Sequence, residues 1–345
     1  MKRAERAMTA WELRRLESAP KSKLRRAARR AAALLPAILA GAMIAEYKLV
    51  PAFPKYASNP IAYPISNMYV YFAAAFGAAL LAWFAVSLVS RRAHEKLLLK
   101  TPLYCVLIIL LIAYDLMTLK TGKLKMPYFP WADRILLAIY EDRLMLLDCI
   151  SHSLVLLFSG YLIGGAAGLV TGVAAGWSRR VSYWVMPLIR LLGPIPSTTW
   201  ISIILVVASS LFGGSVFMIA LGVWYPVTMA ALSGVGNAQR GNFEAARTFG
   251  LGSARLVFKV AVPAAMPSIF NGLTQGMSVA CTALMVAEML GVESGLGWYI
   301  NWQRGWAEFA RMYAAVIVIC LTFTAVNFAL TLARRRVLRY QEDWK

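Results

Sequence analysis

Long apolar stretches alternate along the chain with short basic clusters. A helix needs about 20 mostly apolar residues to cross the hydrocarbon core of a bilayer. Eight stretches come close to this length, at residues 31–50, 68–90, 102–119, 153–177, 184–211, 214–235, 263–290 and 310–333. The pattern therefore predicts an all-α membrane bundle of about eight transmembrane helices.

The basic clusters lie between and beyond these stretches. Lys and Arg gather in residues 1–30, 91–100, 179–190, 240–259 and 334–345. If the first cluster is cytoplasmic and the chain crosses eight times, all five clusters fall on the cytoplasmic side, as the positive-inside rule requires. An odd number of spans would place the last cluster outside. We therefore expect a multi-pass membrane protein with both termini in the cytoplasm.

Composition excludes several other classes of protein. The 345 residues are 60% hydrophobic and 15% charged, which rules out a disordered chain and a conventional soluble enzyme. The formal net charge of +20 would suit nucleic-acid binding, but its confinement to clusters between apolar stretches favours membrane topology, so we expect no nucleic-acid partner. Four dispersed cysteines and two histidines predict no metal site, and we expect no cofactor.

The chain changes character near Asp148. The first three predicted spans are rich in Ala, Leu and aromatic residues, whereas later segments contain many glycines and are interrupted by proline. We therefore expect three parts: a basic cytoplasmic tail at residues 1–30, an extension with three spans at 31–148, and a core at 149–345.

The first span of the predicted core has a glycine at every fourth position. These glycines are Gly160, Gly164, Gly168, Gly172 and Gly176. This spacing places them on one ridge of a helix, where the missing side chains let a neighbouring helix approach backbone to backbone. The ridge predicts a packing surface and not a ligand site.

Two prolines interrupt the next predicted span. Pro194 and Pro196 disfavour a continuous helix, and a broken helix at membrane depth is tolerated only against protein or a water-filled cavity. Ser197 and Thr198 would supply hydroxyl groups beside the break. The segment is either part of a translocation path or a helix start just inside the membrane.

A polar stripe runs along the predicted span at residues 263–290. Its members on the candidate translocation path are Asn271, Gln275, Ser278 and Thr282. Their helical spacing places them on one face, and a polar face within a membrane helix is expected to meet a cavity or another helix. The stripe therefore predicts either a substrate path or interhelical hydrogen bonds.

Two carboxylates lie within predicted spans. Glu288, near the outer end of its span, is a further candidate for the path; it is expected to pair with Arg304 or Arg311, or to face a docked protein. Asp115 is expected to pair with Lys120 or to reach outward. Ionisable residues at such depth generally have a partner or a function.

The loop between the predicted spans at 214–235 and 263–290 has the features of a docking helix. Asn242 favours a helix start, and Glu244 suits the positive end of the helix dipole. Ala245 and Ala246 keep one face narrow, and Gly250 permits a sharp turn. A cytoplasmic helix of this kind is suited to docking with a soluble partner.

This loop resembles the EAA loop of ABC importer permeases, whose pattern is E-A-A-x3-G-x9-I-x-L-P. The matching residues are Glu244, Ala245, Ala246, Gly250 and Pro263, while Val260 and Val262 replace the Ile and the Leu. Segments 176–180, 286–291 and 294–298 are similar to the nitrate/sulfonate/taurine/bicarbonate branch of type I permeases. The resemblance covers about residues 149–339, so the three preceding spans are an extension without an assigned role.

The resemblance implies an assembly of several subunits in the bacterial inner membrane. Two permease subunits, expected to be a homodimer, form the pathway in membrane lipid, two ABC ATPase subunits dock on the EAA loops, and a periplasmic or extracellular binding protein delivers substrate. The implied coupling residues are Glu244, Ala245, Ala246, Arg247 and Gly250. The sequence contains no GxxxxGK[ST] motif, so we expect no enzyme activity in this chain and ATP hydrolysis by the partner.

The substrate is left open by the resemblance. Nitrate, sulfonate, taurine or bicarbonate is the first expectation, and a pyrimidine, a riboflavin-like compound or an aromatic acid is the alternative. A secondary transporter would account for eight spans but not for the EAA loop. A membrane scaffold is the remaining alternative.

Overall fold

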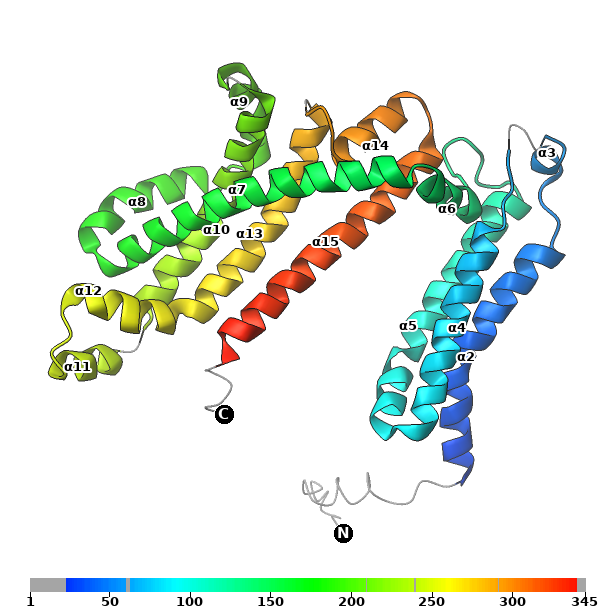
Figure 1. Cartoon of the computed structure of the whole chain (residues 1–345), viewed down its shortest axis with the longest axis horizontal. Coiled ribbons are helices and arrows are strands. Elements are labelled where there is room, and N and C mark those ends of the chain that lie inside the picture. The colour runs from blue at the N-terminus through cyan, green and yellow to red at the C-terminus, as the bar shows by residue number, and fades with distance from the viewer. Residues whose placement is uncertain (1–22, 60–62, 209, 239, 291, 340–345) are drawn as a thin grey trace, which may run out of the picture. The chain divides into compact units, whose positions relative to one another are not determined.

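The computed structural model describes residues 23–59, 63–208, 210–238, 240–290 and 292–339, and the regular structure of these residues is helical (Figure 1). The chain divides into two compact units, one ending at Leu137 and the other beginning at Ala138. Residues 1–22 of the predicted basic tail lie outside the described residues.

Three long helices form the N-terminal unit. They are α2 (Lys23–Leu49), α4 (Met68–Val89) and α5 (Arg91–Asp115), joined by the short α3 (Pro54–Ala57), the π-helical turn η1 (Leu116–Lys120) and the start of α6 (Ala132–Glu141). Helix α2 packs against both α4 and α5. The interior contains large aromatic side chains, including Tyr47, Tyr69 and Trp131, which fill the space between the helices.

Of the two alternatives that the sequence suggested for Asp115, the outward position is wrong, and Lys120 lies near enough to attract the carboxylate without donating a hydrogen bond to it. The side chain of Asp115 is 0% exposed and therefore does not reach outward. Lys120 instead donates hydrogen bonds of 2.7 Å to the backbone carbonyl groups of Tyr47 and Val50. The end of α2 attracts the ammonium group because its last carbonyl groups have no partner within the helix.

The second unit contains the remaining helices. Their bounds are α7 (Arg143–Trp177), α8 (Arg179–Leu192), η2 (Ser197–Trp200), α9 (Ile201–Val207), α10 (Leu211–Gly236), α11 (Arg240–Thr248), α12 (Ser253–Leu256), η3 (Val257–Ala261), α13 (Val262–Leu290), α14 (Leu296–Gly305) and α15 (Phe309–Val337). Helix α10 packs between α7 and α13 (Figure 1). Its buried residues Met218, Val223 and Val227 contribute to the main apolar cluster of this unit.

Seven helical segments among the described residues are long and apolar enough to cross a membrane: Arg30–Leu49, Met68–Val89, Arg91–Lys120, Arg143–Trp177, Leu211–Gly236, Ser253–Leu290 and Phe309–Val337. The predicted span at residues 184–211 is wrong as a continuous helix. Helix α8 ends at Leu192, and the 3-10 turn η2 and the short α9 follow the break. Pro194 and Pro196 lack the N–H groups that would continue the helix.

The broken segment nevertheless returns the chain across the depth of the unit. Helices α7 and α10 run in the same direction, because Gly160 in the middle of α7 lies against Ile219, and Gly176 at the end of α7 lies against Val235 at the end of α10. The chain that leaves α7 at Trp177 must therefore travel back before α10 begins. Helix α8, η2 and α9 make this return without forming one uninterrupted helix.

Candidate functional site

The predicted docking loop is a separate short helix, α11, followed by a turn. Helix α11 begins at Arg240, so the prediction that Asn242 starts the helix is wrong. Arg240 and Gly241 already belong to the helix, two residues before the predicted start. Glu244 consequently lies in the second turn and not at the immediate start.

Gly250 closes α11 in a left-handed conformation, with φ of +75°. Its backbone N–H donates to the carbonyl oxygen of Arg247 at 2.9 Å, and the N–H of Leu251 donates to that of Ala246 at 3.3 Å. These two bonds form a Schellman motif, which satisfies carbonyl groups at a helix end. The predicted sharp turn at Gly250 is confirmed, and its left-handed backbone conformation is one that residues with a β-carbon adopt only at a cost.

One aromatic residue anchors this loop to the rest of the unit. The ring centroid of Phe243 lies 5.8 Å from that of Trp177 at the end of α7, and Phe243 also packs on a buried cluster that includes Val235 of α10 and Ala261 of η3. The loop therefore contacts the ends of three segments that belong to the membrane-spanning helices.

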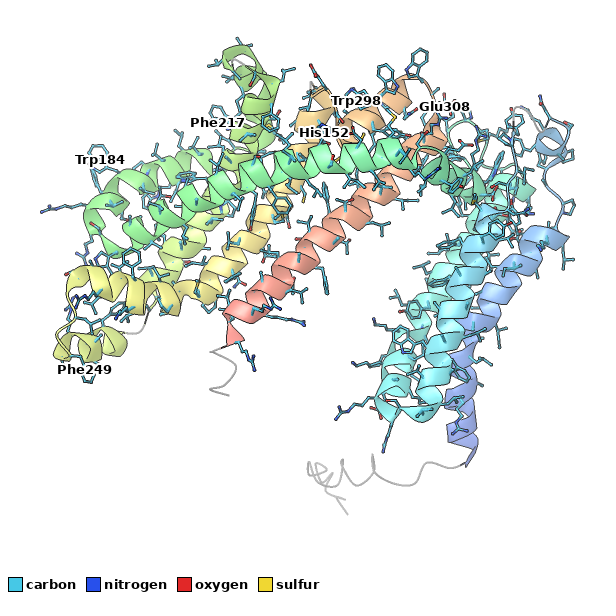
Figure 2. The ribbon with its side chains drawn as sticks, viewed as in Figure 1. His152, Trp184, Phe217, Phe249, Trp298 and Glu308 are labelled. Atoms are coloured by element: carbon cyan, nitrogen blue, oxygen red, sulfur yellow. The ribbon has the colours of Figure 1, made fainter. Side chains whose placement is uncertain are left out.

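The opposite face of the loop is exposed. Glu244, Ala245 and Arg247 are exposed, and Ala246 is half-buried. Phe249, at the tip of the loop, has 84% of its surface exposed and projects away from the unit (Figure 2). An anchored helix that presents small, charged and aromatic side chains in this way is suited to binding a partner surface.

The glycine ridge of α7 lies directly on α10. A Cβ atom at Gly168 would lie 2.9 Å from the carbonyl oxygen of Trp224, and one at Gly172 would lie 2.5 Å from that of Thr228. Gly160, Gly164 and Gly176 face the same helix, and a Cβ atom at Gly164 would meet the backbone of Ala220. The two backbones therefore approach each other more closely than any larger residue would permit.

Hydrogen bonds reinforce this contact, and the sequence analysis did not identify them. The hydroxyl oxygens of Thr171 and Thr228 lie 3.1 Å apart, and the indole N–H of Trp224 donates to Thr171 Oγ1 at 3.1 Å. Hydroxyl groups at a helix contact are common in membrane proteins. The signal was present as Thr171 beside the glycine ridge, but its partner comes from a helix more than fifty residues away.

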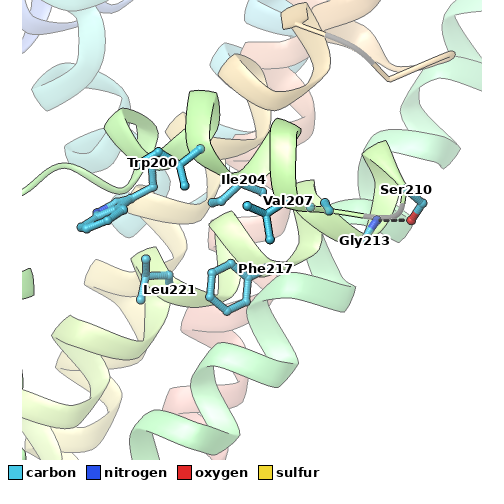
Figure 3. Close-up of a pocket in the computed structure, with 10 residues that line it drawn as sticks. Trp200, Ile204, Val207, Ser210, Gly213, Phe217 and Leu221 are labelled. Carbon is cyan, nitrogen blue, oxygen red and sulfur yellow. Dashed lines mark hydrogen bonds between the residues drawn. The ribbon is translucent and has the colours of Figure 1, made fainter.

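Two pockets lie along the broken segment. The first has a volume of about 460 Å³ between α9 and α10 and is lined by Trp200, Ile204, Val207, Phe217 and Leu221 among others (Figure 3). The second, of about 220 Å³, shares Trp200 and Leu221 with the first and continues toward α13. None of the residues that line these two pockets has a charged side chain.

The structure brings together part of the predicted path. Pro196, Ser197 and Gln275 line the second pocket, whereas Pro194 and Thr198 belong to the same break without lining it. The other stripe residues of α13, Asn271, Ser278 and Thr282, are exposed in the single chain.

The hydroxyl groups of the stripe bond to their own helix. Ser278 Oγ donates to the Thr274 carbonyl oxygen at 3.4 Å, and Thr282 Oγ1 donates to that of Ser278 at 3.1 Å. These groups therefore do not need another helix to satisfy their hydrogen-bonding capacity, and the exposed face of α13 is open to water or to a partner.

Glu288 has a different role from the one expected. The prediction of a pair with Arg304 or Arg311 is wrong: the carboxylate, on a residue only 1% exposed, accepts hydrogen bonds from Ser153 Oγ at 2.6 Å and from the backbone N–H of Gly297 at 2.7 Å. Ser153 Oγ also accepts from the N–H of Leu296 at 2.9 Å. The carboxylate thus satisfies donors at the start of α14, where anionic groups are favoured.

Two glycines make room for this carboxylate. Gly295 has φ of +149°, and a Cβ atom there would lie 2.5 Å from the Glu288 carboxyl carbon. A Cβ atom at Gly297 would lie 2.9 Å from Glu288 Cβ. Glu288 and the glycines Gly295 and Gly297 come from the two segments that resemble the permease branch, and they form one contact.

Arg311 pairs with another carboxylate. Its Nε lies 3.2 Å from Asp142 Oδ2, and the Tyr299 hydroxyl donates to the same oxygen. Burial, followed by the hydrogen bond to Asp142, raises the pKa of Tyr299. This pairing connects α14 to Asp142 and leaves Arg311 unavailable to Glu288.

Comparison with known proteins gives a consistent set of relatives. The family model described as "Binding-protein-dependent transport system inner membrane component" matches residues 164–339. The Bacillus subtilis aliphatic sulfonates transport permease SsuC is 26% identical over 186 residues, which are 54% of this chain and 67% of that protein. The ABC transporter permease MJ0413 of Methanocaldococcus jannaschii is 31% identical over 203 residues, 57% of this chain and 72% of that protein.

Two further similarities involve proteins with named substrates. The Escherichia coli taurine transport permease TauC is 28% identical over 177 residues, 51% of this chain and 63% of that protein. Among solved structures, an inward-facing form of the MetNI methionine ABC transporter aligns with 57% of this chain and 98% of its own, at 19% identity and a TM-score of 0.49.

Proposed function

The chain belongs to the family of binding-protein-dependent transport system inner membrane components, the permeases of ABC importers, and we propose that α11 is the surface through which a separate ATPase subunit drives it. The observation that carries this proposal is the combination of an exposed Glu244–Arg247 face with the Phe243 anchor. In the proposed assembly, two copies of this chain pair with two ATPase subunits, and an external binding protein delivers the solute.

The contacts of α11 suggest how motion is transmitted. When the ATPase subunits close on ATP, they draw the two α11 helices together. Phe243 would pass this displacement to the ends of α7 and α10, and the helical segment Ser253–Leu290 would carry it along α13. A rigid-body rotation of these packed helices changes which side of the membrane the cavity faces.

The same arrangement gives the proposed orientation. Helix α11 must lie in the cytoplasm to reach an ATPase, and the basic clusters at residues 179–190 and 240–259 agree with that side. The parallel course of α7 and α10 adds one return crossing through the broken segment. Eight crossings in the bacterial inner membrane, with both termini cytoplasmic, follow from this orientation.

The names of the relatives support a small sulfonate-type anion as the first candidate substrate. The pockets beside the broken segment favour the second candidate, a planar aromatic or heteroaromatic solute. Trp200, Phe217, Trp224 and Tyr225 line them, and their lining residues include no charged side chain. Anions are normally bound by cationic groups or several aligned donors, whereas aromatic solutes are bound by rings and apolar walls.

The coupling proposal is tested by reversing the charge of Glu244. Glu244→Lys should leave insertion and folding unchanged, because the side chain is exposed, but should abolish co-purification with the ATPase and the stimulation of hydrolysis by loaded binding protein. Glu308→Lys is the matched control, since it makes the same charge change on an exposed residue just before α15. Normal ATPase recovery and stimulation in Glu244→Lys would refute the assignment of α11.

The substrate is tested separately with the partner binding protein. Thermal stabilisation of that protein by taurine or an alkanesulfonate would favour the first candidate, and stabilisation by a pyrimidine or an aromatic acid would favour the second. Trp200→Ala should then reduce uptake of an aromatic solute more than it reduces ATPase association.

A further inference from the structure

The pocket of about 220 Å³ beside the broken segment contains polar groups that the coupling proposal does not use. Ser197 comes from η2, Tyr225 from α10 and Gln275 from α13, and all three residues line the pocket. Their hydroxyl and amide groups have no hydrogen-bond partner among the groups that the structure describes. Three separate segments therefore bring unpaired hydrogen-bonding groups to one cavity.

Two glycines fix the positions of the hydroxyl groups. A Cβ atom at Gly222 would lie 2.8 Å from Ser197 Oγ and 3.0 Å from Val279 Cγ1, so the serine hydroxyl lies directly over the backbone of α10 and next to α13. A Cβ atom at Gly193 would lie 2.7 Å from Tyr225 Cζ, the atom that bears the phenolic hydroxyl. The break in the helix thus approaches α10 closely enough to place both hydroxyl groups at the pocket.

Aromatic rings form much of the pocket wall. Trp200, Trp224 and Tyr225 all line it. The indole N–H of Trp224, its only polar group, already donates to Thr171 Oγ1 of α7 at 3.1 Å. Trp224 therefore offers a ligand a ring surface held in place by α7, and hydrogen bonding is left to the three unpaired side chains.

The chemistry of the lining restricts the kind of ligand. None of the lining residues is charged, so a carboxylate or sulfonate would lose its hydration without gaining a cationic partner. The side-chain amide of Gln275 presents a donor beside an acceptor, the arrangement that pairs with a heteroaromatic edge carrying the complementary two groups. The volume lies below the range of about 300–1,000 Å³ that is usual for drug-sized ligands, which favours a single ring.

We infer, building on the proposed transport function, that this pocket recognises a neutral single-ring heteroaromatic solute and that Gln275 determines its specificity. The rings of Trp200 and Trp224 cover the faces of the solute, and Gln275 pairs with an edge on which a donor and an acceptor are adjacent. An alkanesulfonate and an aromatic acid do not fit, because each carries a negative charge that would have no partner in the pocket. Gln275 is exposed, so a solute on that face of α13 reaches the pocket directly.

The test measures binding to the intact permease in lipid nanodiscs, without the ATPase or the binding protein. Cytosine and uracil are the probes, because both are neutral rings with the required edge; benzoate and taurine are the charged comparison compounds. Dissociation constants come from saturation-transfer NMR titrations at neutral pH. We expect saturable binding of at least one pyrimidine, with benzoate and taurine at least tenfold weaker. Absence of pyrimidine binding, or a charged compound within tenfold of it, would overturn the inference.

Gln275→Leu removes the amide and retains similar bulk. It should weaken pyrimidine binding about tenfold, the scale of one lost two-point contact. Asn327→Leu is the matched control, because Asn327 is an amide on a membrane helix that donates to the carbonyl group of Phe323 at 3.1 Å, within α15, and does not line the pocket. An equal loss in both variants would contradict a specific role for Gln275.

A second pair of variants keeps the test decisive if Gln275→Leu does not fold. Ser197→Ala should weaken pyrimidine binding about threefold to tenfold, the effect of one lost hydrogen bond. Ser233→Ala should not, because Ser233 is an exposed serine of α10 whose hydroxyl donates to the Ala230 carbonyl group at 3.2 Å. Unchanged affinity in Ser197→Ala and in Gln275→Leu would mean that ring contacts alone hold the solute, against the inference. None of these measurements involves α11, so their failure and a failure of the coupling proposal are distinguishable.

Discussion

The two units of this protein bury their helices by opposite means. In the second unit, α7 and α10 approach backbone to backbone because a glycine occupies every fourth position of α7. In the N-terminal unit, large rings fill the space: Tyr56 and Trp131 lie 5.2 Å apart and Tyr47 and Tyr69 lie 5.3 Å apart, measured between ring centroids. Close backbone approach leaves little room for adjustment, whereas a ring-filled interior depends on the volume of individual side chains.

The two units also differ in the hydrogen-bond donors that their buried carboxylates have. Glu288 in the second unit accepts hydrogen bonds from Ser153 and Gly297 and fixes the start of α14. Glu46 and Asp115 in the N-terminal unit have no such donors among the described residues. The N-terminal unit thus contains a buried carboxylate with backbone donors, Asp133, beside two without them, whereas Glu288 of the second unit has donors for its carboxylate.

The largest expected effect breaks the ring-filled interior. Trp131→Ala should destabilise the N-terminal unit by about 3–5 kcal/mol, because the side chain is 0% exposed and its removal leaves a cavity. Hydrogen exchange followed by mass spectrometry should show lost protection in peptides of α2, α4 and α5. Equal loss in peptides of α7 and α10 would show that the two units do not respond separately.

A smaller effect separates two glycines by the same substitution. Gly168→Ala should destabilise the second unit by about 2–3 kcal/mol, because the new methyl group would meet α10. Gly41→Ala on α2 should be neutral or stabilising by up to about 1 kcal/mol, because a Cβ atom there has nothing within 4 Å and alanine favours the helix.

Unfolding in mixed detergent micelles, monitored by circular dichroism, measures both variants. The prediction is a lower free energy of unfolding for Gly168→Ala and an unchanged or higher one for Gly41→Ala. Similar changes in the two variants would mean that the ridge is not held at the observed distance from α10.

The smallest effect sharpens the comparison of carboxylates. Glu288→Gln should cost about 1–2 kcal/mol, because the side-chain amide can present only one oxygen to the two donors that the carboxylate accepts. The loss should be local, and proteolysis of the segment before α14 should become faster. Unchanged proteolysis would show that Glu288 does not fix α14, whatever its effect on transport.

Features that depend on neighbouring residues could be predicted from the sequence. Six of the eight predicted spans lie almost wholly within long continuous helices. The span at 102–119 also lies within a longer segment, Arg91–Lys120. The turn at Gly250 was predictable because the backbone conformation of a glycine after a short helix is a local property. The span at 184–211 failed for an equally local reason, since its apolar composition was given more weight than its two prolines.

Features that depend on distant residues could not be predicted. The sequence placed Glu288 near the outer end of a span and offered Arg304 and Arg311 as partners, because both are close in the chain. Its actual partner Ser153 is 135 residues away, and nothing in the surroundings of Ser153 distinguishes it from other serines in spans. The same holds for Thr171 and Trp224, which meet only because α7 and α10 are parallel neighbours.

By itself, the sequence determined that this protein is helical and crosses a membrane, because hydropathy, glycine spacing and turn preferences depend on short stretches of chain. The resemblance of one loop to a known motif, and not these patterns, indicated the permease family. The tertiary structure decided which polar groups are satisfied. Glu288 received donors from α7 and α14, and the broken segment placed Ser197 beside Gln275. The carboxylates of Glu46 and Asp115 and the hydroxyl of Tyr69 were buried without hydrogen-bond partners among the described residues. Contacts between distant residues decide this because a buried polar group has no water to bond to. It raises the free energy of the fold unless another part of the protein supplies a partner.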